Sequence, residues 1–196
     1  MNAFTPVSKE QFYRFIESRI DERYEFEGGL IVQQMAGGTR RHSEIAKRIM
    51  RSWDDQLPRT NWVILNERGI ETPDRVRFAD VVVEPADEPD DSLASTRPVI
   101  IVEVLSPSSR AYDLKIKPTE YLGIPTLDAY LVFSQTEPAV RLWQRGADGI
   151  FAQEPTEIEG LDQRLTLSCR TFTVILELSV IYDGLLGDAL SRPSAG

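Results

Sequence analysis

The segments VRFADVVVE (residues 76–84) and PVIIVEVLSPSS (98–109) decide the fold of this chain. Each contains an apolar run rich in Val and Ile, at 79–83 and 99–105, a pattern that predicts strands buried on at least one face. Each run carries one acid, Asp80 in the first and Glu103 in the second. Because an ionised carboxylate inside an apolar strand is costly unless a cation compensates it, the two acids predict a shared positive partner. A divalent metal ion is the simplest candidate.

A second pattern follows Glu103. EVLSPS (103–108) precedes D-x-x-x-K-x-x-x-Y (Asp113, Lys117 and Tyr121), a Gly-Ile-Pro turn and the strand DAYLVFS (128–134). From about residue 24 to residue 143, this arrangement resembles the Uma-type "putative restriction endonuclease" family of the PD-(D/E)XK nuclease superfamily. The resemblance implies an α/β fold with a restriction-endonuclease-like mixed central sheet flanked by helices. It also implies a Mg²⁺- or Mn²⁺-dependent endonuclease that acts on DNA, and a homodimer.

The resemblance assigns Asp80 and Glu103 as metal ligands and a lysine as the group that orients the attacking water. In the superfamily this lysine normally stands two residues after the Glu, where this chain has Leu105. The Uma-type pattern places the lysine on the following helix, which points to Lys117. The missing strand lysine also favours the competing hypothesis, a nuclease-fold domain without activity that serves as a binding or assembly module.

Pro118 complicates the choice of lysine. A proline disfavours the helical conformation in the residue before it and is tolerated in the first turn of a helix. The helix is therefore expected to start near Pro118, which leaves Lys117 on its lead-in and keeps Lys115 as the competing candidate.

Two auxiliary residues complete the predicted site. Glu25 lies in a predicted hairpin closed by Gly28-Gly29, an N-terminal addition to the core, and the resemblance makes it an outer metal ligand or water-holder; the alternative is an exposed strand residue. His42, the only histidine, opens a predicted helix and is either auxiliary to the site, as the resemblance implies, or a hydrogen-bonding cap. Glu44 competes with it, because nucleases of this superfamily commonly place an acid on the first core helix.

The charge of the chain constrains how it meets DNA. Its 31 acidic and 22 basic residues give a net charge of −9, the wrong sign for a protein that coats nucleic acid nonspecifically. The basic residues must then be concentrated, and one helical segment carries several of them. The residues predicted to contact DNA are Arg41, Lys47, Arg48 and Arg51. The alternative is a solvated helix face.

Composition and missing motifs narrow the class further. No signal-peptide core and no run of 18 apolar residues is present, so we expect a cytoplasmic protein without a membrane segment. The single Cys169 excludes an internal disulfide. Neither a Walker loop nor G-x-G-x-x-G nor G-x-S-x-G occurs, so we expect no organic cofactor and no serine-hydrolase elbow.

We expect a single domain over residues 1–196, with an N-terminal helix in 1–23, a core in 24–154 and a C-terminal extension in 155–196. The helix at 39–57 is expected on one face of the sheet and the helical segment at 113–122 on the other. The remaining predicted elements are a helix at 8–16, hairpins at 24–32, 61–84 and 139–153, a surface loop at 85–98, strands at 99–105, 128–134 and 165–167, a helix at 172–186 and frayed final residues.

Overall fold

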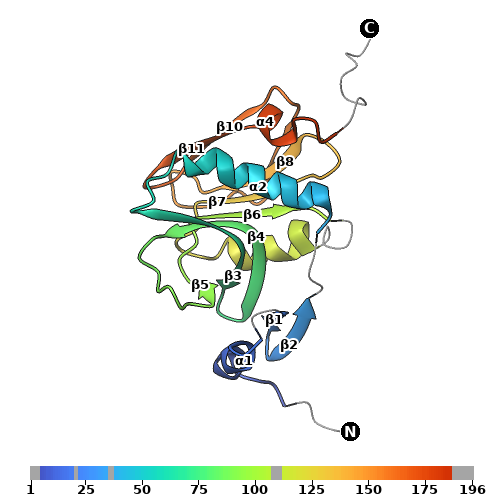
Figure 1. Ribbon diagram of the computed structural model, residues 1–196. Coiled ribbons are helices and arrows are strands. Elements are labelled where there is room, and N and C mark those ends of the chain that lie inside the picture. Colours follow the sequence, from blue (N-terminus) through green and yellow to red (C-terminus); the bar gives the residue numbers. More distant parts are fainter. Residues whose placement is uncertain (1–4, 20–21, 35–37, 107–111, 187–196) are drawn as a thin grey trace.

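A computed structural model describes residues 5–19, 22–34, 38–106 and 112–186 (Figure 1). A central sheet runs in the order β2-β1-β4-β6-β7-β8-β9, and β3 pairs with both β4 and β5. Strands β6 and β7 are parallel, as are β3 and β5, while the other pairs of this sheet are antiparallel. The predicted mixed sheet is confirmed. Its strands are β1 (Arg23–Glu27), β2 (Leu30–Gln34), β3 (Trp62–Glu71), β4 (Arg75–Pro85), β5 (Ala94–Ser95), β6 (Ile100–Val104), β7 (Ala129–Phe133), β8 (Ala139–Gln144) and β9 (Thr156–Glu159).

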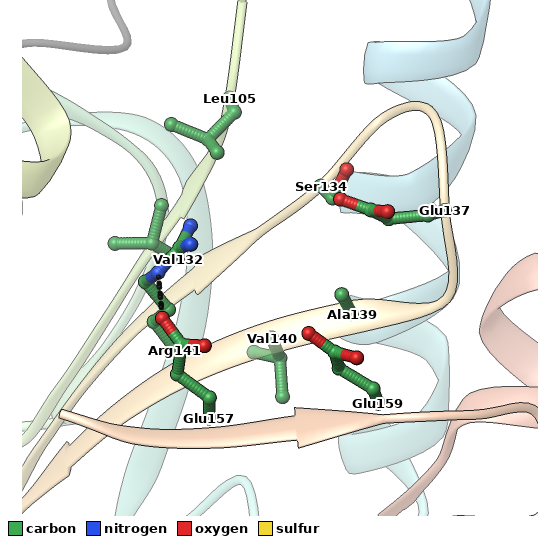
Figure 2. Close-up of a pocket in the computed structure, with 9 residues that line it drawn as sticks. All are labelled: Leu105, Val132, Ser134, Glu137, Ala139, Val140, Arg141, Glu157 and Glu159. Carbon is green, nitrogen blue, oxygen red and sulfur yellow. Dashed lines mark hydrogen bonds and ion pairs between the residues drawn. The ribbon is translucent and has the colours of Figure 1, made fainter.

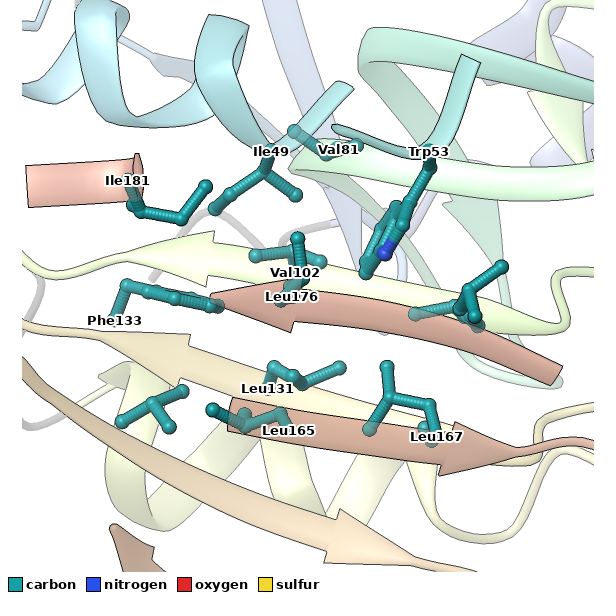
Figure 3. Packing of buried hydrophobic residues seen from close by; sticks show 14 of the residues in the cluster. Ile49, Trp53, Val81, Val102, Leu131, Phe133, Leu165, Leu167, Leu176 and Ile181 are labelled. Atoms are coloured by element: carbon teal, nitrogen blue, oxygen red, sulfur yellow. The ribbon is translucent and has the colours of Figure 1, made fainter. Parts of the chain in front are cut away.

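Helix α2 (Arg40–Asp54) covers one face of the sheet, as the sequence predicts. The Thr39 hydroxyl caps it by accepting a hydrogen bond from the His42 N–H at 3.1 Å. Its apolar stripe of Ile45, Ile49 and Trp53 is fully buried. A hairpin of β10 (Arg164–Ser168) and β11 (Thr173–Glu177) packs into the same apolar cluster (Figure 3).

The opposite face is covered by a π-helical turn, η1 (Tyr112–Ile116), that leads into α3 (Lys117–Tyr121). Tyr121 and Tyr130 pack edge to face there, with ring centroids 5.5 Å apart, and both are fully buried. The two helical segments therefore flank the sheet as expected. Among the described residues, no helix is long and apolar enough to cross a membrane.

The N-terminal elements form as predicted. Helix α1 (Lys9–Ile16) begins with a capping box between Ser8 and Gln11, and Phe12 packs against Phe26 of β1. The β1–β2 turn uses Gly28 and Gly29, both with positive φ. Strand β1 also pairs with the start of β4, which joins this hairpin to the central sheet.

Three predicted elements are wrong. The predicted 172–186 helix is strand β11 followed by the short helix α4 (Leu178–Tyr182), because β-branched residues at the start of this segment pair with β10. Residues 150–153 make only one bridge, from Phe151 to Arg145, and β8 pairs instead with β9. The predicted loop at 85–98 contains β5, with Ser95 fully buried. The final residues predicted to fray lie outside the described residues.

Candidate functional site

The site lies where the pairing of β4 is interrupted. One edge of β4 pairs with β3, and the other pairs with β1 at residues 75–76 and with β6 at residues 81–83. Within the described chain, residues 77–80 have no strand partner on that second edge. The Asp80 carboxylate fills part of the gap, since its Oδ2 accepts the Val104 N–H at 2.7 Å. Asp80 thus lies at the fork between β4 and β6.

Strand β3 is also irregular opposite Asp80. The β3–β4 pairs Asn66–Val81 and Arg68–Ala79 flank the position where Glu67 would pair with Asp80, and that pair is missing. Glu67 has a φ of 53°, in the left-handed region that side chains rarely adopt. Backbone conformations of this kind concentrate at functional sites, where the surrounding structure holds them in place.

His42 approaches Asp80 from the first turn of α2. Its Nε2 lies 3.0 Å from Asp80 Oδ2. The hydrogen bond to Asp80 raises the pKa of His42, and this effect outweighs its burial, which acts in the other direction. Both side chains line a cavity of about 350 Å³ between α2 and β3, whose other lining residues are Ser43, Ala46, Lys47, Met50, Asn66 and Glu67.

Glu103, on β6, is ion-paired to Lys117. The Lys117 Nζ lies 2.8 Å from Glu103 Oε1 and 3.0 Å from Asp113 Oδ1, and all three side chains are buried. Burial raises the pKa of Glu103 well above its usual range, against the opposing effect of Lys117. Burial acts to lower the pKa of Lys117, but the nearby negative charges outweigh it and raise that pKa.

The two candidate lysines have different surroundings in the structure. Lys115 is exposed, whereas Lys117 is the first residue of α3 and points at Glu103. Pro118 follows in the first turn of α3, close to where the sequence predicted a helix start. Asp113 was not among the predicted site residues, although its D-x-x-x-K spacing to Lys117 is the signal that could have identified it.

Glu25 is not an exposed strand residue, which excludes that alternative. Its carboxylate accepts hydrogen bonds from Arg77 Nη1 at 2.9 Å, Gln34 Nε2 at 2.9 Å and the Phe78 N–H at 3.1 Å. Arg77, which is almost fully buried, also binds Glu27 and Glu120. Glu25 therefore lies at the unpaired edge of β4, in an ionic network with Arg77 at its centre.

The predicted DNA-contacting residues do not form one uniform face. Arg48 binds Glu44 and donates to the carbonyls of Ile181 and Asp183, at 3.1 and 2.6 Å, so it joins α2 to the C-terminal elements. Lys47 and Arg51 are exposed. Glu44 pairs with Arg48 at 3.1 Å and, more loosely, with Lys47 at 3.8 Å; Lys47 in turn lines the cavity that contains Asp80.

Arg41 lies at the start of α2, at the opposite end of the helix from Arg51. It donates to the Gln135 carbonyl at 3.2 Å and lines a cavity of about 490 Å³. The cavity is also lined by Thr39, Arg40, Leu105, Ser106, Ser134, Gln135 and Thr136. Arg41, Lys47 and Arg51 are thus exposed to a ligand, although Arg41 and Lys47 each make one contact within the protein, whereas Arg48 is engaged by several groups.

Known proteins resemble this chain in sequence and in fold. The sequence pattern of a family named Uma2 and described as "Putative restriction endonuclease" matches residues 9–180. The chain belongs to the Uma2 family. It is 30% identical over 191 residues to the uncharacterized protein slr1290 of Synechocystis, with 93% of this chain and 94% of that protein covered.

A solved structure shares the fold of this Uma2 protein. A crystal structure of a "putative nuclease belonging to DUF820" from Anabaena variabilis superimposes with a TM-score of 0.64, covering 90% of this chain and 98% of that chain. The identity is 15%, so the likeness concerns the fold alone. Family membership and this nuclease-like fold together support a nuclease function.

The donor groups of this Uma2 protein fit a divalent cation in part. Asp80 Oδ1 and Glu103 Oε2 have no hydrogen-bond or ion-pair partner among the described residues, so each acid keeps one oxygen for a cation. No group of three or more His, Cys, Asp or Glu residues in the described chain is arranged to hold a metal. Mg²⁺ suits such a sparse donor set, because it binds through one or two carboxylates and keeps several waters.

The shared cation that the sequence predicted is not needed to neutralise the two strand acids. Asp80 has His42 as its partner and Glu103 has Lys117. What remains uncompensated is the cluster of Glu103, Asp113 and Lys117, which holds two buried acids and one base. Such an excess negative charge can be relieved by a proton on Glu103, in keeping with its raised pKa, or by a cation beside it.

A separate cavity of about 30 Å³ is lined by residues of β7, β8, β9 and the segment that joins β7 to β8 (Figure 2). Glu137, Glu157 and Glu159 line it, and Arg141 Nε binds Glu157 at 2.9 Å. None of the Asp80, Glu103 and Lys117 side chains lines this cavity. We therefore do not count it as part of the candidate site.

Proposed function

We propose that this Uma2 protein is a Mg²⁺- or Mn²⁺-dependent endonuclease that hydrolyses DNA phosphodiester bonds at the β4–β6 fork. The observation that carries the proposal is the 2.8 Å contact between Lys117 and Glu103, beside the fork that contains Asp80. Asp80 and Glu103 would hold the cation through their unpartnered oxygens. A cation in this position supplies Lewis acidity and an activated water for attack on phosphorus.

The side chains of the site supply the rest of the chemistry. The Lys117 ammonium would orient the attacking water and neutralise charge that develops on the phosphate. His42, hydrogen-bonded to Asp80 through Nε2, would fix that carboxylate in place and could exchange a proton with it beside the cavity that both residues line. Glu25 would act through Arg77, by fixing the edge of β4 that precedes Asp80.

The exposed basic residues suggest the path of the DNA. Arg41, Lys47 and Arg51 would contact backbone phosphates along α2, which borders the cavity that contains Asp80. Because one such site cuts one strand, cleavage of a duplex requires two sites, and we expect the protein to act as a homodimer.

Cleavage of supercoiled plasmid DNA with Mn²⁺ tests the proposal, with Lys117→Met and the exposed Lys115→Met as a matched pair. We expect loss of cleavage in Lys117→Met and near-parental cleavage in Lys115→Met. Loss in Lys115→Met alone would overturn the assignment of the lysine. Chelation of the metal should abolish cleavage by the parent.

Metal binding is measured separately from cleavage by thermal denaturation. A ligand present at about 100 times its Kd stabilises the folded state by about 2.7 kcal/mol, so Mn²⁺ should raise the Tm of the parent. Asp80→Asn and Glu103→Gln should remove this rise while leaving the protein folded. If both variants respond to Mn²⁺ like the parent, the two acids are structural.

A second candidate function is an inactive nuclease-fold domain that serves as a binding or assembly module. The observation that favours it is that Leu105 stands where the superfamily normally has its lysine, in a chain of net charge −9. A parent protein that binds DNA but shows neither a Mn²⁺-dependent Tm nor cleavage would support this candidate over the nuclease.

A further inference from the structure

Asp113 has a carboxylate that is directed at Lys117. The residue is 1% exposed, and its Oδ1 lies 3.0 Å from the Lys117 Nζ. Among the described residues, this carboxylate has no other hydrogen-bond or ion-pair partner than Lys117. The backbone of Asp113 is held by β7, because its carbonyl accepts a hydrogen bond from the Tyr130 hydroxyl at 2.8 Å. Asp113 is therefore a fixed negative charge beside the lysine.

The ion pair is a poor device for stability alone. A buried ion pair often contributes no more than apolar residues of the same volume would, because both charges must be desolvated. Here a second buried acid shares one ammonium with Glu103, so two carboxyl groups face a single base. Glu103 keeps one oxygen without a partner, whereas the ammonium is held from two sides.

We propose that Asp113 is a positioning residue that retains the Lys117 ammonium in the site when Glu103 directs its charge to a divalent cation. The inference rests on the proposed function. With Asp113 present, the lysine has a carboxylate partner that the cation does not use. Without it, Lys117 would keep only Glu103 and a long contact of 3.4 Å to the Phe78 carbonyl, and it would compete with the cation for the Glu103 carboxylate.

The test is a double-mutant cycle on Mn²⁺ affinity, measured from the electron paramagnetic resonance signal of free Mn²⁺. We expect Asp113→Asn to weaken Mn²⁺ binding about tenfold or more, because Lys117 then turns to Glu103 and competes with the cation for that carboxylate. In the Lys117→Met background the same substitution should weaken binding by less than about threefold, since the competing ammonium is gone. Equal weakening in both backgrounds would overturn the proposal.

A milder pair of variants keeps the test valid if Asp113→Asn does not fold. Tyr130→Phe removes only the hydroxyl that holds the Asp113 carbonyl, and we expect a weakening of Mn²⁺ binding of about two- to fivefold. Tyr182→Phe is the matched control: its buried hydroxyl donates to the Ser134 carbonyl at 2.7 Å, away from the site, and Mn²⁺ affinity should not change. Equal affinities in the two variants would contradict the proposal.

The failure of this inference can be told apart from failure of the proposed function. A parent that neither binds Mn²⁺ nor cleaves plasmid DNA overturns both. A parent that does both, with Asp113→Asn and Tyr130→Phe indistinguishable from it, overturns the role of Asp113 alone. Retained cleavage in Asp113→Glu, with loss in Asp113→Asn, would support a requirement for the charge at this position.

Discussion

Replacing Arg77 by Met should destabilise the protein strongly. The Arg77 side chain is 2% exposed and lies 2.9 Å from Glu25 and 3.0 Å from both Glu27 and Glu120. Without the guanidinium, Glu27 and Glu120 still have Arg75 within 3.6 and 3.4 Å, but Glu25 loses its ion-pair partner while it stays buried. Removing one partner of a buried ion pair costs about 3–5 kcal/mol, which in a chain of this size corresponds to a Tm lower by roughly 6–20 °C.

Thermal and urea denaturation of two matched variants measure this loss. Arg75→Met removes a neighbouring guanidinium whose side chain is 30% exposed, and it should cost no more than about 1 kcal/mol. Adding Glu25→Gln to Arg77→Met should recover part of the stability, because it removes the orphaned charge. The reasoning is refuted if Arg77→Met melts within about 2 °C of Arg75→Met, a difference of less than roughly 1 kcal/mol.

Three further predictions follow from the site. As the only histidine, His42 should give one pair of imidazole C–H resonances, from Cε1 and Cδ2, that titrate above the ordinary pKa of 6.5. Asp80→Asn should lower this pKa, and an unshifted titration in the parent would contradict the pairing. Since the pKa of His42 is raised in the folded state, its pair with Asp80 contributes stability that is fully present below the ordinary pKa and is lost as pH rises through the raised one. The destabilisation caused by His42→Asn should therefore be larger at about pH 5.5 than at about pH 9 in denaturant titrations. Replacing Arg41, Lys47 or Arg51 by Gln should in each case reduce the slope of log K for DNA binding against log salt concentration by about 0.9, with little change in Tm. Arg48→Gln should instead lower the Tm, because it breaks the hydrogen bonds between α2 and the C-terminal elements. An unchanged slope would assign the exposed residues to a solvated face.

Local patterns in the sequence predicted the parts of the fold that local patterns control. The stripe of Ile45, Ile49 and Trp53 predicted α2, since each fills the same buried face one helical turn apart. The valine-rich runs around Asp80 and Glu103 predicted β4 and β6, because each strand is buried nearly throughout. The helical periodicity matches the buried face of α2, and the apolar runs match the burial of β4 and β6.

The misassigned C-terminal segment has a non-local cause. Residues 172–186 carry apolar residues at spacings that suit a helix, but Val174 and Leu176 face the main core from β11 while Ile181 reaches the same core from α4. The β10 partner decides between the two structures, and its position depends on the tertiary fold. Periodicity within one segment does not contain that information.

The geometry of the site also depends on strands that are distant in the sequence. Asp80 is recognisable as an acid in an apolar strand, but its position at a fork depends on β1 and β6 sharing one edge of β4 and leaving residues 77–80 between them. The left-handed backbone of Glu67 on the other side of β4 carries no sequence signal either, since glutamate has no special tolerance for it. The sequence therefore predicts the acids of the site but not the gap that contains them.

Pro118 fixes the start of α3, and this start determines which acids Lys117 contacts. A proline has no N–H, so a regular helix through it would leave a carbonyl four residues upstream without its donor. The π-helical turn of η1, whose hydrogen bonds span five residues, removes that requirement just before α3 begins. Lys117 is consequently the first residue of α3, and its ammonium lies between Asp113 of the π turn and Glu103 of β6. The proline that made the lysine hard to assign from the sequence thus marks the helix start at which the lysine meets both acids.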